Sequence, residues 1–120
     1  MKSLLIATLV ATLSLTAQAS ERPAHFKGAE ISSAQQALSV LQEQNSKLAA
    51  LLAGELNPTS MTEIHQLTYT LENALAKLPA ASDEIKEVLE EVHQGSETMD
   101  YQRVKDNGAY YLQLAKALLK

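Results

Sequence analysis

The stretch that decides the fold is residues 61–78, MTEIHQLTYTLENALAKL. The side chains that form its apolar stripe recur every three or four positions, which places them on one face of an α-helix. They are Met61, Ile64, Leu67, Thr68, Leu71, Ala74, Leu75 and Leu78. Asn57-Pro58 begins this helix directly, or Ser60 begins it through a capping box with Glu63, and Pro79 ends it. The stretch therefore predicts an amphipathic helix whose apolar face packs on other helices.

Helical periodicity continues on both sides of this stretch. One helix is predicted from Ser32 or Ser33 to Gly54, a third from Ser82 to Gly95, and a fourth from Ser96 or Thr98 to the C-terminus. Their stripes are Ala34, Leu38, Leu41, Leu48 and Leu52; Ile85, Val88, Leu89 and Val92; and Met99, Val104, Gly108, Tyr111, Leu112, Ala115 and Leu118. No window shows strand alternation. Because the loops are short, we expect an all-α, antiparallel, up-down-up-down four-helix bundle over residues 32–120.

A polar layer is expected near one end of this bundle. In a helical hairpin, residues at equal distances from the loop lie at equal heights, because both helices rise by the same amount per residue. Reflection through the three loops places Asn45, His65, His93 and Tyr101 in one layer, each from a different helix. Asn45 occupies the position in the first apolar stripe that is otherwise missing.

Further polar and sulfur-bearing side chains surround this layer. Met61, Met99 and Glu97 lie within about one or two helical turns of it. Tyr69 and Glu72 follow the first histidine at i+4 and i+7, so they form a second stripe beside the apolar one.

Two interpretations of the layer remain open. In the first, His65, His93, Met61 and Met99 bind a metal ion or haem, because imidazole binds Zn, Cu, Ni or Fe and thioethers select Cu(I). Outside the cytoplasm, a set of histidine and methionine ligands favours copper over other metals. In the second, the histidines are half-exposed hydrogen-bonding residues, Asn45 fixes helix register, and the methionines fill gaps.

The amino-acid composition argues against several other functions. The chain has no cysteine, which excludes thiol catalysis, zinc-thiolate sites, iron–sulfur clusters and covalent c-type haem. Its formal net charge is −4 without a basic cluster, which argues against binding nucleic acid or anionic membranes. We find no nucleophile–base spacing and no Gly-rich phosphate loop, and we expect Glu90-Glu91 to be a solvated pair. We therefore expect no enzyme. We expect a structural or interaction module whose partner is an envelope protein or a second copy, with the metal or haem module as the alternative.

The N-terminal residues have the three parts of a secretory signal peptide. Lys2 gives a positive start, residues 3–15 form an apolar run, and Ala17-Gln18-Ala19 is a small-x-small cleavage motif. This run of 13 residues is shorter than the roughly 20 that span a bilayer. We predict cleavage before Ser20, a periplasmic or secreted location, and no membrane insertion after cleavage. Loss of Lys2 changes the net charge from −4 to −5.

An irregular arm, residues 20–31, is expected between the signal peptide and the bundle. It contains Pro23 and Gly28, which argue against regular structure. Phe26, the only phenylalanine, is expected to hold the arm against the bundle.

Three motifs resemble a family of small exported bacterial proteins of unknown function. They are Arg22-Pro23-x-His25-Phe26-Lys27-Gly28; Ile64-His65-Gln66-Leu67-Thr68-Tyr69-Thr70-Leu71-Glu72-x-Ala74; and Glu91-Val92-His93. The resemblance covers most of the mature chain, and the second motif is the most specific. It implies a helical, signal-bearing, periplasmic protein and no particular activity.

The architecture is also similar to that of the cytochrome b562 class of exported four-helix haem proteins. That class takes its haem ligands from a methionine early in the first helix and a histidine late in the last. The corresponding helices here have no methionine and no histidine, respectively.

Overall fold

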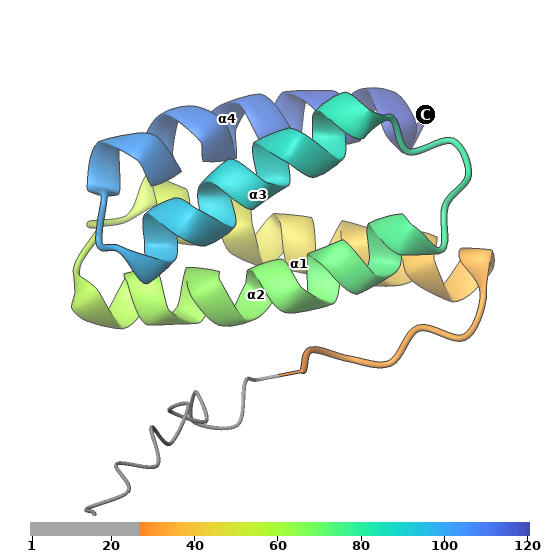
Figure 1. Ribbon diagram of the computed structural model, residues 1–120, viewed down its shortest axis with the longest axis horizontal. Coiled ribbons are helices and arrows are strands. Elements are labelled where there is room, and N and C mark those ends of the chain that lie inside the picture. The colour runs from red at the N-terminus through yellow and green to blue at the C-terminus, as the bar shows by residue number, and fades with distance from the viewer. Residues whose placement is uncertain (1–26) are drawn as a thin grey trace, which may run out of the picture.

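The computed structural model describes residues 27–120, which form four α-helices and no strand in that range (Figure 1). Helix α1 spans Ala34–Ala53, α2 Pro58–Ala76, α3 Asp83–Glu97 and α4 Tyr101–Leu118. The expected all-α four-helix bundle is confirmed. The predicted signal peptide, residues 1–19, and Phe26 lie outside the described residues.

Side chains at the helix N-termini explain where three of the helices begin. Ser33 accepts a hydrogen bond from the backbone N–H of Gln36 at the start of α1, and Ser82 accepts one from Ile85 at the start of α3. Asn57 and Ser60 form a reciprocal capping box that begins α2, with Pro58 at its first position. These bonds satisfy backbone donors that have no partner within the helix.

The prediction that α3 ends at Gly95 is wrong, and so is the start predicted for α4. Helix α3 continues to Glu97, and Asp100 caps α4 by accepting from the backbone N–H of Arg103. Gly95 is buried where α3 meets α4, and an added Cβ would lie 3.0 Å from Val104 Cγ2. Close packing, rather than helix termination, thus accounts for this glycine.

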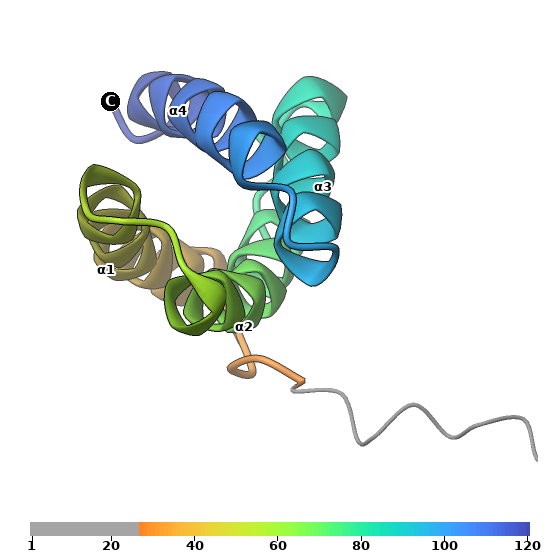
Figure 2. The same cartoon turned by 90° about the vertical axis from the view of Figure 1, so that its left-hand side faces the viewer.

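Figure 2 shows the bundle end-on, with the helices arranged around a common core. Each helix packs on its neighbours in the chain, and α1 also packs on α4. The largest fully buried apolar side chains come from all four helices: Leu41, Leu48, Met61, Ile64, Leu71, Leu75, Leu89, Val92, Val104 and Tyr111. Most members of the predicted stripes therefore contribute to the core.

The first stripe needs two corrections, because Ala34 and Leu38 are both exposed. Leu38 is 41% exposed, and Ala37 is buried in its place. Successive helical residues are turned by about 100°, so the core face of α1 follows Ala37, Leu41, Asn45 and Leu48 and leaves the neighbouring Leu38 outside.

The segment before α1 folds back along α2 (Figure 1). Asn73 donates hydrogen bonds to the carbonyl oxygens of Lys27 and Ala29, and the Ala29 N–H donates to Thr70 Oγ1. Gly28 has φ 69° and lies against the α2 backbone, where an added Cβ would come within 2.8 Å of Thr70 N. Both the left-handed conformation and the close approach require glycine.

Within residues 27–120, no helix combines the length and the apolar character that crossing a bilayer requires.

We expect Gly28→Ala to lower the free energy of unfolding by about 1–3 kcal/mol, because a Cβ combines left-handed strain with a backbone clash. Gly54→Ala is the matched control, since its added Cβ meets atoms only at ordinary contact distances. Urea denaturation followed by circular dichroism measures both variants. Equal stability of the two variants would contradict the packing described for the arm.

Candidate functional site

Three rings meet on the side of the bundle formed by α2 and α3. The ring centroids of His65 and His93 are 4.8 Å apart, and the Tyr69 ring lies 5.1 Å from His65 and 4.7 Å from His93. All three pairs are edge-to-face. Residues four apart on a helix share a face, so α2 presents His65 and Tyr69 together toward His93 on α3.

Hydrogen bonds fix the tautomer of His93. Its Nδ1 lies 2.8 Å from Glu72 Oε1 and 3.1 Å from Thr68 Oγ1. The Thr68 hydroxyl donates its single hydrogen to the His65 carbonyl oxygen at 2.6 Å, so toward His93 it can only accept. An ionised Glu72 carboxylate also only accepts. The hydrogen therefore resides on Nδ1, and in the neutral ring the lone pair is on Nε2.

This arrangement is the usual support for a metal-binding histidine. A carboxylate that accepts from one ring nitrogen orients the ring and makes the other nitrogen a better ligand. Here Glu72 on α2 has this supporting position, and His93 is the residue it orients. The His93 side chain is 12% exposed and that of Glu72 is 34% exposed, so the imidazole is largely shielded from water and the carboxylate is partly shielded.

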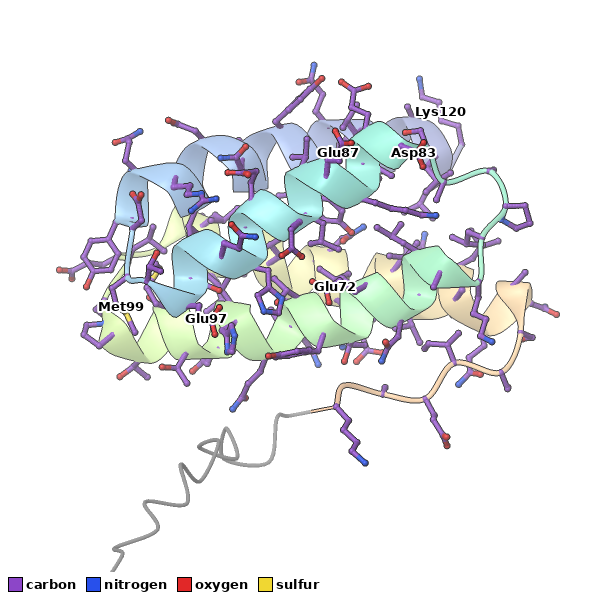
Figure 3. The ribbon with its side chains drawn as sticks, in the orientation of Figure 1. Glu72, Asp83, Glu87, Glu97, Met99 and Lys120 are labelled. Carbon is purple, nitrogen blue, oxygen red and sulfur yellow. The ribbon has the colours of Figure 1, made fainter. Side chains whose placement is uncertain are left out.

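One group of potential ligands contains His65, His93 and Glu97, whose ligand atoms lie within 4.8 Å of one another. Glu97 is exposed in the last turn of α3 and follows His93 by four residues, so it shares that residue's helix face. Figure 3 labels Glu97 and Glu72 on the side of the molecule where α2 and α3 meet. Two imidazoles and one carboxylate form a ligand set that binds divalent transition metals.

A second group contains Glu72, Glu90 and His93, with ligand atoms again within 4.8 Å. Glu90, on α3, is exposed and also accepts a hydrogen bond from Gln94. His93 thus belongs to both groups.

The electrostatics of Glu72 reflect its position between the helices. Burial raises the pKa of its carboxyl above the ordinary value of 4.5. His93 opposes this effect through its charge and hydrogen bond, and the nearby charge of Glu90 adds to it.

Asn45 does not pair with Tyr101. Tyr111, buried on α4, donates a hydrogen bond to Asn45 Oδ1 at 2.7 Å and links α4 to α1. Burial raises the pKa of the Tyr111 hydroxyl. Tyr101 is 40% exposed in the first turn of α4. The prediction that Tyr101 belongs to the polar layer is wrong, because α3 is longer than expected. The centre of the α3–α4 loop therefore lies at about Met99, and the α4 position at the height of His93 is about 105.

The two methionines predicted as ligands lie in different surroundings. Met61 is fully buried in the hydrophobic core. Met99 is not on α4, as the sequence suggested, but in the α3–α4 connection, where it is 43% exposed and has φ 57° (Figure 3).

We refer to the residues that meet here as the histidine cluster: His65, Thr68, Tyr69, Glu72, Glu90, His93 and Glu97. Sequence reasoning missed the roles of three of its members. Thr68 was assigned to the apolar stripe, Glu90 to a solvated pair, and Glu97 only to the neighbourhood of the layer. A helical spacing signal was nevertheless present: Thr68 follows His65 by three residues, while Glu90 precedes His93 by three and Glu97 follows it by four.

A separate hollow lies elsewhere on the molecule, between α1 and α2. It is a groove of about 670 Å³ bordered by the arm at Gly28 and Ala29, with Leu51 and Leu67 among its apolar walls. The histidine cluster does not line it.

Residues 1–120 match the model of a family of unknown function (DUF6746). The chain belongs to this family. No curated protein and no solved structure matches it. Membership confirms the resemblance to a family of unknown function, and it assigns no role to the histidine cluster of this DUF6746 member.

In metal-free protein, we expect Glu72→Gln to become more stable relative to wild type as the pH rises from about 4 to about 6. A raised pKa means that the folded chain retains this proton to higher pH than the unfolded chain, so ionisation of Glu72 costs stability as the pH rises. Glutamine cannot ionise and avoids this loss. Urea denaturation with a chelator present measures the difference, and Glu87→Gln, which changes an exposed carboxylate on α3, is the control. A constant stability difference between wild type and Glu72→Gln across this range would refute the assignment.

Proposed function

We propose that this protein binds one divalent transition-metal ion at the surface between α2 and α3, with His65, His93 and Glu97 as ligands. The observation that carries the proposal is the convergence of these three side chains from two helices to within 4.8 Å between ligand atoms. The imidazole of His93 would bind through Nε2, because its Nδ1–H is directed to Glu72.

The chemistry of this ligand set favours Zn(II) and Cu(II). Both ions bind imidazole nitrogen and carboxylate oxygen well, and Cu(II) binds a given set more tightly than Zn(II). The set contains no thioether, so it gives no preference for Cu(I). Three protein ligands leave a coordination position for water or a further molecule, in contrast to the four ligands of a purely structural zinc site.

Geometry is the reason to prefer metal binding over the structural or interaction role that the sequence alone favoured. Export to the periplasm and an interaction with an envelope protein or a second copy stay predictions. Export would place a metal-binding protein where copper and zinc ions are handled outside the cytoplasm.

We expect the purified chain to bind Zn(II) or Cu(II) in isothermal titration calorimetry with a Kd tighter than about 10 μM. His65→Ala and His93→Ala should each weaken binding by at least about tenfold, because each removes one of three ligands. Met99→Gly is the matched control, since it removes an exposed thioether from a left-handed position that glycine adopts freely.

Wild-type binding weaker than about 10 μM, or unchanged binding in a His65→Ala, His93→Ala double variant, would refute the proposal. A loss of affinity in Met99→Gly equal to that in His93→Ala would instead assign the metal to a thioether-containing set.

We expect Glu72→Gln to weaken metal binding by about 10- to 100-fold while the fold stays intact, because the amide no longer orients His93 as a carboxylate does. Glu72→Asp, which keeps the charge, should recover part of this loss. Calorimetry measures affinity, and circular dichroism checks the fold. Full affinity in Glu72→Gln would show that the bond to His93 has no part in binding.

A further inference from the structure

A hollow lies along the seam between α1 and α4, and Figure 2 shows this seam across the bundle from the side where α2 and α3 meet. The volume of the hollow is about 320 Å³, which is within the range of pockets that bind small molecules. The residues of the histidine cluster do not line it, so it is a site separate from the proposed metal site.

Asn45 lines this hollow and carries a hydrogen-bond donor without a partner. The residue is 8% exposed, and its Oδ1 accepts from the Tyr111 hydroxyl at 2.7 Å. The amide nitrogen still has two hydrogens to donate. Within residues 27–120, nothing accepts a hydrogen bond from Asn45 Nδ2. Because an unpaired buried donor is costly, a ligand that presents an acceptor oxygen to this amide gains affinity.

Lys116 gives the hollow a positive charge. It is exposed in the last turn of α4, and its ammonium forms no ion pair with any part of the chain that the structure describes. The other described residues that line the hollow are uncharged, although the chain as a whole has a net charge of −4. The hollow therefore favours an anionic ligand over a cationic one.

Apolar side chains form much of the remaining wall: Ala49 on α1 and Leu112, Ala115 and Leu119 on α4. An alkyl chain that packs against them is removed from water, which favours binding. A water molecule in the liquid occupies about 30 Å³, so the hollow has room for a ligand of about ten non-hydrogen atoms.

We propose that this hollow binds a free medium-chain carboxylate. The carboxylate accepts a hydrogen bond from Asn45 Nδ2 and pairs with the Lys116 ammonium, and the alkyl chain lies on the apolar wall. Octanoate has the required size, charge and apolar character.

Isothermal titration calorimetry of the purified chain with octanoate tests this site. We expect a Kd tighter than about 1 mM. The alcohol of the same chain length, 1-octanol, should bind at least about tenfold more weakly, because it has no charge to pair with Lys116.

Two pairs of variants locate the ligand. Ala49→Leu should weaken octanoate binding by at least about tenfold, because the larger side chain fills the hollow, whereas Ala50→Leu changes the neighbouring exposed alanine outside the hollow and should bind as wild type. Lys116→Met should remove the preference for octanoate over 1-octanol, and Lys105→Met, an exposed change on α4 outside the hollow, should retain it. Circular dichroism checks the fold of each variant.

Nuclear magnetic resonance of the wild-type chain reports on the amide directly. Addition of octanoate should shift the side-chain amide signal of Asn45, and that of Asn57, which caps α2, should stay in place.

Wild-type binding weaker than about 1 mM, or full affinity in Ala49→Leu, would overturn the inference. An equal loss in Ala50→Leu would also overturn it, because the ligand would then lie outside this hollow. Equal affinity for octanoate and 1-octanol, or an Asn45 amide signal that octanoate does not move, would contradict the roles assigned to Lys116 and Asn45 and would likewise overturn it.

Discussion

The packing of α2 on α3 is the interaction on which the fold and the site both depend. The chain has no cysteine, so burial of apolar side chains has to hold the bundle together. With Ile64, Leu71 and Leu75 committed to the core, the face of α2 beside them is turned toward α3. That face carries His65, Tyr69 and Glu72, and α3 brings His93 against it. The polar cluster is thus positioned by the same packing that stabilises the bundle.

Sequence periodicity predicted the fold well because it reports directly on burial. The stripes of α2 and α3 and the caps at Asn57 and Ser82 are all found in the structure. One failure occurred at a glycine. Gly95 has the sequence appearance of a helix end, but it is a contact point between α3 and α4, and only the three-dimensional arrangement distinguishes these roles.

The site was partly predictable for the same reason. Reflection through the α2–α3 loop predicted that His65 and His93 lie at the same height, and their rings are in contact in the structure. Reflection across the α3–α4 loop failed, since an error of a few residues in the loop centre is doubled at the reflected position. It therefore selected Tyr101 rather than a position near 105, and it gave no indication of the bond between Tyr111 and Asn45. The roles of Thr68 and Glu72 depend on hydrogen-bond directions, which periodicity does not contain.

The most direct test of this account is the structure of the zinc-loaded protein with anomalous diffraction at the zinc edge. The account predicts a zinc peak between α2 and α3, bonded to His65, to His93 through Nε2 and to Glu97, at about 2.0–2.2 Å from each ligand atom. The Glu72 carboxylate should still accept from His93 Nδ1. A zinc ion bound elsewhere, or none at a concentration that saturates the protein in solution, would contradict the account.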